Sequence, residues 1–105
     1  MEEAIEYRFL AHLRCERSLQ QIAHTFKLSP IDCEPQDKHS YFIHIGNDIL
    51  ILEGERNILL HGSCERKDSA HQLIEHLNHY QIGHSADLFE EDGRLIQRWE
   101  KAFSG

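Results

Sequence analysis

Nine histidines occur among the 105 residues, and three of them, together with one cysteine, have spacings typical of zinc sites. His61 and Cys64 are three positions apart, and after eleven intervening residues His76 and His79 repeat that spacing. The apolar stripe of the helix expected over 69–80 leaves His76 and His79 on its outer side. His61 and Cys64 would have to reach around this helix to share an ion, so we expect no metal and no cofactor.

Nucleophilic catalysis is a second possible chemistry, because the segment HGSC at 61–64 places a serine and a cysteine beside a histidine. The candidate nucleophiles are Ser63, Cys64 and Ser69, and the candidate bases are His61 and His71. The segment lacks the G-x-S-x-G pattern that exposes a nucleophile, and a turn between strand and helix explains its glycine and serine equally well. We therefore expect no catalytic residue, with a hydrolase or transferase using Cys64 and His61 as the enzyme alternative.

The charge pattern argues against a nucleic-acid partner. There are 18 acidic and 11 basic side chains, for a net charge of −7, and the longest basic run is Arg66-Lys67. A phosphate-binding surface needs clustered lysine and arginine. The segment SLQQIAHTFKLSP resembles the first half of a helix-turn-helix, but residues 31–39, with Pro35, have no apolar stripe for a second helix.

The first third of the chain contains one firm helix signal and one ambiguous stretch. Ser18 and Gln21 have the spacing of a capping box, and the apolar residues that follow recur at helical intervals, which predicts a helix over 18–28. Residues 2–15 alternate as a strand does, but their glutamates, alanines and leucine favour a helix, which we predict there. Residues 29–39 carry both prolines and no hydrophobic period, which indicates a solvated connection.

Three apolar runs in the middle of the chain have the composition of strands. They cover 40–45, 48–53 and 57–61, and they are joined by Gly46-Asn47 and by Gly54-Glu55-Arg56. Both junctions suit tight connections, so the pattern predicts a three-stranded antiparallel meander.

The last third predicts a helix over 69–80, capped by Asp68 or Ser69, and then a hairpin. The hairpin strands are expected at about 84–90 and 94–99, although residues 93–103 also fit an amphipathic helix. An acidic cluster at the hairpin tip could bind a cation, but we interpret it as a solvated turn; it comprises Glu90, Glu91 and Asp92. The chain is thus expected to form one α+β domain over 1–105, with two layers and an antiparallel sheet of about five strands.

The meander has apolar residues on both of its faces. If Gly46-Asn47 forms a two-residue loop, Ile45 lies opposite Asp48, and the residues of the two strands sort into two sets. One set contains Tyr41, Ile43, Ile45, Leu50 and Leu52, and the other contains Phe42, His44, Ile49 and Ile51. A sheet packed on one side normally has a polar second face, so we expect a second cover here. Phe42, Ile49 and Ile51 are the predicted partner-binding residues; a register error of one would exchange them for Ile43, Leu50 and Leu52.

Cysteine usage and hydropathy favour a cytoplasmic protein. The three cysteines are odd in number and widely spaced, which fits reduced thiols better than a disulfide framework. The longest apolar run is four residues, so we expect no membrane span and see no secretory signal.

Several phrases of the chain resemble the small, acidic, dimeric chaperones of type III secretion systems that bind single effectors. These phrases are LQQIAHTFKLSPI at 19–31, SYFIHI at 40–45, DILILEGERNILLHGS at 48–63, HQLIEHLNH at 71–79 and SADLFEEDGRLIQRW at 85–99. The resemblance implies a homodimer without catalytic activity that keeps part of a secreted effector extended in the bacterial cytoplasm. It also implies that the helix over 69–80 helps form the dimer, with Leu73, Leu77 and Tyr80 as the expected subunit contact.

A small acidic inhibitor or immunity-type protein would show the same composition and size. Such a protein binds a folded partner as a compact monomer, whereas the chaperone binds an extended, protease-sensitive segment. The two classes therefore differ in the partner state that they accept.

Overall fold

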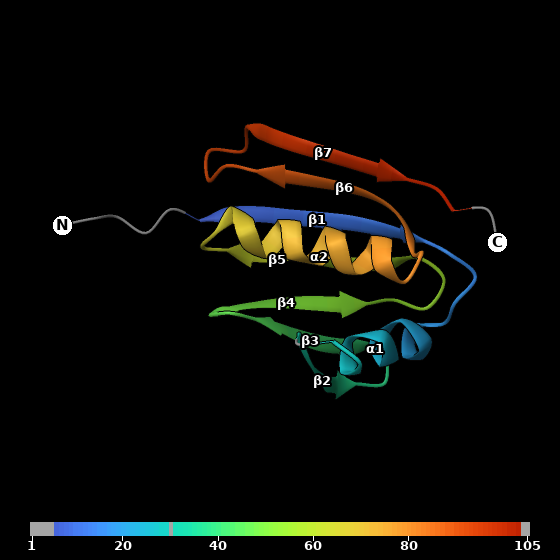
Figure 1. The fold of residues 1–105 in the computed structure, drawn as a ribbon. Helices are drawn as coiled ribbons and strands as arrows, with labels where there is room; N and C mark the ends of the chain where they lie inside the picture. The colour runs from blue at the N-terminus through green and yellow to red at the C-terminus, as the bar shows by residue number, and fades with distance from the viewer. Residues whose placement is uncertain (1–5, 30, 104–105) are drawn as a thin grey trace.

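The structure, a computed structural model, describes residues 6–29 and 31–103, which form one seven-stranded antiparallel sheet with two helices on one face (Figure 1). In chain order the elements are β1 (Tyr7–Arg14), α1 (Leu19–Lys27), β2 (Asp32–Asp37), β3 (Ser40–Ile45), β4 (Asp48–Glu53), β5 (Ile58–Cys64), α2 (Lys67–His79), β6 (Gly83–Phe89) and β7 (Leu95–Lys101). The strand order is β2-β3-β4-β5-β1-β6-β7. The expected two-layer α+β class is confirmed, but the sheet has seven strands instead of about five.

The first additional strand is β1, where a helix was predicted over 2–15. Residues 7–14 instead pair with β5 on one side and with β6 on the other, so β1 lies inside the sheet. The alternation of buried Phe9, Ala11 and Leu13 with outward neighbours is the strand signal that outweighs local helix propensity. Residues 2–5 of that prediction lie outside the described part of the chain.

The second additional strand is β2, which occupies most of the segment interpreted as a solvated connection over 29–39. β2 pairs with β3 at the edge of the sheet, with a register shift between Pro35 and Asp37. Its residues are almost all exposed, so backbone pairing and not apolar periodicity places it in the sheet. A proline and several acids are typical of edge strands, because they discourage further pairing.

The two helices begin differently. The Ser18 hydroxyl accepts a bond from the Gln21 backbone, and the Gln21 side chain accepts one from the Ser18 backbone, which confirms the capping box of α1. α2 starts two residues earlier than predicted, with Arg66 at the N-cap and no capping side chain there. Asp68 and Ser69 are therefore inside the first turn. Within the described residues, neither helix has the length and hydrophobicity that crossing a membrane requires.

The predicted hairpins are confirmed. Ile45 pairs with Asp48 across Gly46-Asn47, where Gly46 adopts a positive φ of 59°, so the assignment of residues to the two faces is correct. β6 and β7 form the predicted C-terminal hairpin, and the alternative helix over 93–103 is wrong.

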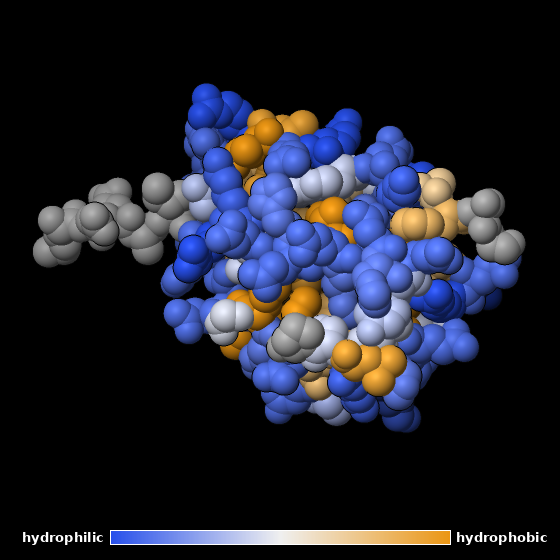
Figure 2. Space-filling model, in the orientation of Figure 1, coloured by the Kyte–Doolittle hydropathy of each residue, from blue (hydrophilic) through white to orange (hydrophobic). Residues whose placement is uncertain are grey.

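The core lies between the helices and one face of the sheet. Its largest fully buried apolar members come from α1, α2, the inward positions of the strands and the connection before β6: Phe9, Phe26, Ile22, Ile43, Leu50, Leu52, Leu60, Leu73, Leu77, Ile82 and Leu88. Figure 2 shows the helix-bearing side, which is mostly hydrophilic with small, separate hydrophobic patches. The apolar side chains of the two helices thus point mainly into the core.

Candidate functional site

The second face of the sheet is not covered by any helix among the described residues, and we call it the open face (Figure 1). Burial alternates along the strands that form it: in β4, Asp48, Leu50 and Leu52 are buried, and Ile49 and Ile51 are exposed or half-buried. The apolar residues of the open face are Leu10, Phe42, Ile49, Ile51, Leu59 and Phe89. An uncovered apolar face of this kind is a candidate binding surface.

Residues of four neighbouring strands form one lateral row across the centre of the open face. Phe42 pairs with Ile51, Ile51 with His61, and His61 with Leu10. The row continues to Glu34 at one end, and to Asp87 and Arg98 at the other. Side chains at paired positions lie about 5 Å apart, so the row has a continuous centre with charged ends. An apolar centre with a polar rim is the usual layout of a protein-binding surface.

Basic side chains pair with three carboxylates on this face. Arg98 Nε lies 2.7 Å from Asp87 Oδ1. His44 Nε2 and His61 Nε2 each lie 3.1 Å from a carboxylate oxygen, of Glu34 and Glu53 respectively. These contacts hold the polar groups beside the apolar centre in defined positions without covering it.

The residues predicted to bind a partner all lie on the open face. Ile49 is 54% exposed, and Phe42 and Ile51 are half-buried. Their binding role stays a prediction, but their side chains are available to a partner.

The residues predicted for a subunit contact are placed differently. Leu73 and Leu77 are fully buried between α2 and the sheet, so their side chains belong to the core and offer no surface to a second subunit. Tyr80, at the end of α2, is half-buried. Only Tyr80 keeps the exposure that such a contact needs.

The four residues with zinc-like spacing do not come together. The His61 side chain is on the open face and binds Glu53, whereas Cys64 points to the opposite, core-facing side of β5. His76 is buried and His79 is exposed. Among residues 6–29 and 31–103, no group of three or more histidine, cysteine or acidic side chains is arranged to hold a metal.

Two of the candidate nucleophiles, Cys64 and Ser69, are buried, and the third, Ser63, is exposed at the end of β5. Cys64 is fully buried, and burial, with a smaller effect of the Asp48 carboxylate, raises the pKa of its thiol to about 12. A thiol with so high a pKa is a poor nucleophile at neutral pH. Ser69 donates a 2.7 Å hydrogen bond to Asp48 Oδ2, and the other oxygen of Asp48 accepts from the Glu65 backbone at 2.9 Å. This network attaches the start of α2 to β4 and has a structural role.

His76 was expected on the outer side of its helix, and that placement is wrong. Its ring stacks on Phe26 of α1, with centroids 3.9 Å apart, and its Nε2 lies 2.9 Å from Thr25 Oγ1. The Thr25 hydroxyl donates to the Ile22 carbonyl at 2.6 Å, so His76 Nε2 carries the proton and donates to Thr25. Burial, with a smaller effect of His79, lowers the pKa of His76 to about 4. His76 is therefore a neutral core residue that joins the two helices.

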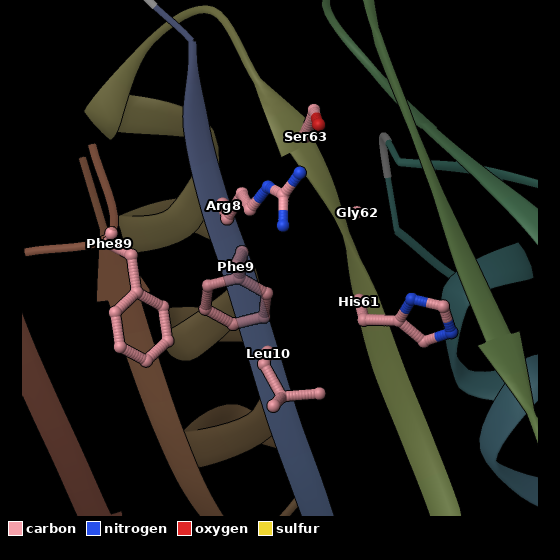
Figure 3. Close-up of a pocket in the computed structure, with 8 residues that line it drawn as sticks. Arg8, Phe9, Leu10, His61, Gly62, Ser63 and Phe89 are labelled. Carbon is pink, nitrogen blue, oxygen red and sulfur yellow. The ribbon is translucent and has the colours of Figure 1, made fainter. Parts of the chain in front are cut away.

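Sequence reasoning missed one part of the open face, namely the residues of β1, β6 and β7. A hollow of about 520 Å³ opens there, and Figure 3 shows side chains from β1, β5 and β6 around it. Its lining includes Arg8, Leu10, His61, Ser63 and Phe89. The strand alternation at 7–14 was the available signal for Arg8 and Leu10.

No family model matches the chain, and neither a curated protein nor a solved structure matches it. The open face combines an apolar centre, side chains paired with carboxylates and a hollow. Of the candidate nucleophiles, Cys64 and Ser69 are buried on the other side of the sheet, and Ser63 lies exposed at the hollow.

Proposed function

We propose that this protein is a non-catalytic binding protein that holds an extended segment of another polypeptide on the open face. The observation that carries the proposal is the uncovered row of Phe42, Ile51, His61 and Leu10. The resemblance to secretion chaperones makes a secreted effector the expected partner, and export of that effector the expected process.

The dimensions of the open face support this proposal. Seven strands spaced about 4.8 Å apart, each about 20–25 Å long, give a surface of roughly 600–700 Å². A standard protein interface uses about 800 Å² per partner, so this face alone provides most of such an area.

The expected second subunit and compartment are part of the proposal. A homodimer would contact through the exposed part of Tyr80 and its surroundings, because Leu73 and Leu77 are in the core. The cytoplasm is the proposed compartment, since all three cysteines are free thiols and persist best under reducing conditions. Light scattering should give about twice 12.3 kDa, and a clean monomer would remove the dimer from the proposal.

The proposal is tested with one polypeptide in two states. Fluorescently labelled lactalbumin that has been reduced and carboxymethylated remains unfolded, whereas the native, disulfide-bonded form is compact. We expect the labelled unfolded form to raise its anisotropy on titration with the protein, and the native form to remain unbound. A preference for the native form would support the inhibitor alternative instead.

Two substitutions locate the binding. Ile51→Asp places a charge at the centre of the open face and should abolish binding of the unfolded probe. Leu28→Asp makes the same kind of change at a 65% exposed leucine at the end of α1 and should leave binding unchanged. Equal effects of the two variants, with both proteins folded by circular dichroism, would contradict the proposal.

A further inference from the structure

Arg8 is a cation of the open face that has no carboxylate partner within the described residues. Its paired neighbours in the sheet are Ser63 on β5 and Phe89 on β6, both uncharged. The diagonal neighbour Asp87 is already bound by Arg98. Arg8 is exposed, and no ion pair among residues 6–29 and 31–103 uses its guanidinium, whose donors can reach a group from another molecule.

The surroundings of Arg8 combine this free charge with apolar walls. Arg8 lines the 520 Å³ hollow together with Leu10 and Phe89, and Figure 3 shows Arg8 on β1 between Ser63 and Phe89. A volume in the range of about 300–1,000 Å³ has room for a bulky side chain. The hollow can therefore take an apolar side chain while Arg8 reaches a charge beside it.

The other charged residues of the open face lie beside histidines, on the edge strands or at the far end of β1. Glu34 and Glu53 lie beside histidines, and Asp32 and Glu100 are on the edge strands β2 and β7. Arg14, the other arginine on this face of β1, lies six residues from Arg8 at the far end of the strand. Apart from His61, Arg8 is thus the charged side chain among the residues that line the hollow, and the acidic residues Glu90, Glu91 and Asp92 lie in the adjoining turn before Gly93, where Arg94 binds Glu90.

We propose that the bound segment presents a carboxylate next to a bulky apolar side chain, with the carboxylate on Arg8 and the apolar group in the adjoining hollow. This inference rests on the proposed function and specifies the chemistry of its partner. Arginine and carboxylate form paired, charge-assisted hydrogen bonds that are stronger than neutral ones. The net charge of −7 would by itself favour basic segments, so a preference for acidic ones is specific to this site.

Three sets of fluorescein-labelled ten-residue peptides test the inference. All sets share the same central leucine and phenylalanine residues, which are flanked by glutamate in the first set, by glutamine in the second and by lysine in the third. We expect the glutamate set to bind about tenfold more tightly than the glutamine set, and the lysine set to bind most weakly. Raising the salt concentration should reduce the difference between the sets.

Two arginine variants assign the preference to a residue. Arg8→Gln should bind the glutamate and glutamine sets with equal affinity. Arg56→Gln makes the same change in net charge in the exposed turn between β4 and β5, and it should keep the wild-type preference.

The outcomes separate this inference from the proposed function. Equal binding of all three sets by the wild type, or a preference that Arg8→Gln retains, would overturn the role of Arg8 and leave polypeptide binding intact. Loss of all three sets in Ile51→Asp, with loss of only the acidic preference in Arg8→Gln, is the expected pattern. Absence of binding by the wild type to every set would overturn both.

Discussion

Phe42 on β3 and Ile51 on β4 lie directly opposite each other in the antiparallel register, on the sheet face that neither helix covers. Their neighbours Ile43 and Leu50 form the next pair and are fully buried on the other face. One register therefore separates residues that stabilise the fold from residues that are free to bind.

Adjacent residues of β4 should differ sharply in their contribution to stability. Leu50→Ala removes a fully buried side chain and is expected to lower the free energy of unfolding by about 2–5 kcal/mol. Ile49→Thr changes a side chain that is 54% exposed and should shift it by no more than about 0.5 kcal/mol. Urea unfolding of both variants measures this difference. A comparable loss in both would mean that the open face is packed.

His76 should make the protein less stable as the pH falls. The unfolded chain binds a proton at this histidine near pH 6.5, whereas the folded protein, with the pKa lowered to about 4, binds it only in more acidic solution. Between these values the unfolded state binds more protons than the folded state. The contribution of His76 to the free energy of unfolding is therefore complete above pH 6.5, and it decreases as the pH falls to about 4.

The expected size of this loss is about 1–3 kcal/mol, measured by urea unfolding between pH 7 and pH 4. His76→Gln keeps a donor for Thr25 and lacks the titrating group, so its stability should fall less steeply over the same interval. If the free energy of unfolding fell equally with pH in the variant and the wild type, His76 would not be the residue that causes the loss of stability.

Asp48 should matter more than a surface aspartate near the same helix. Asp48→Asn turns one of its two accepting oxygens into a donor that faces the donor of Ser69 or Glu65, and we expect a loss of about 1–3 kcal/mol. Asp68→Asn breaks an exposed contact with Arg66 and should cost less than about 1 kcal/mol. Thermal unfolding of the two variants gives the comparison, and the reverse order would contradict the role assigned to Asp48.

The three thiols should react in a defined order. Cys64 is fully buried with a pKa near 12, and it is expected to remain unmodified by iodoacetamide at pH 7.5 in the folded protein. Cys15 and Cys33 are half-buried, and burial also raises the pKa of Cys33, so Cys15 should react first. Mass spectrometry of digested samples follows each site. Rapid alkylation of Cys64 would mean that β5 opens readily.

Local patterns were sufficient for much of the fold. The capping box at Ser18 located α1, and the turn at Gly46-Asn47 determined the register of β3 and β4, because two-residue loops leave no freedom in the pairing. That register is also what assigned Phe42, Ile49 and Ile51 to one face.

Other features depended on contacts distant in sequence. β1 has residues of good helix propensity, and only its pairing with β5 and β6 makes it a strand. β2 has no apolar period, since an edge strand with exposed side chains needs none. The helical spacing of α2 placed His76 outward, but α1 packs beside α2 and buries it. Arg8 belongs to the open face because β1 is a strand of the sheet, which the helix predicted over 2–15 did not indicate.

The most direct test of the account is photo-crosslinking from one side of the sheet and from the other. A benzophenone amino acid is introduced at Ile49 on the open face and, in a second protein, at the exposed Gln72 of α2. Each protein is irradiated with reduced, carboxymethylated lactalbumin, and adducts are counted by mass spectrometry. We predict adducts from position 49 and almost none from position 72. Equal adducts from both positions, or adducts from position 72 alone, would contradict binding on the open face.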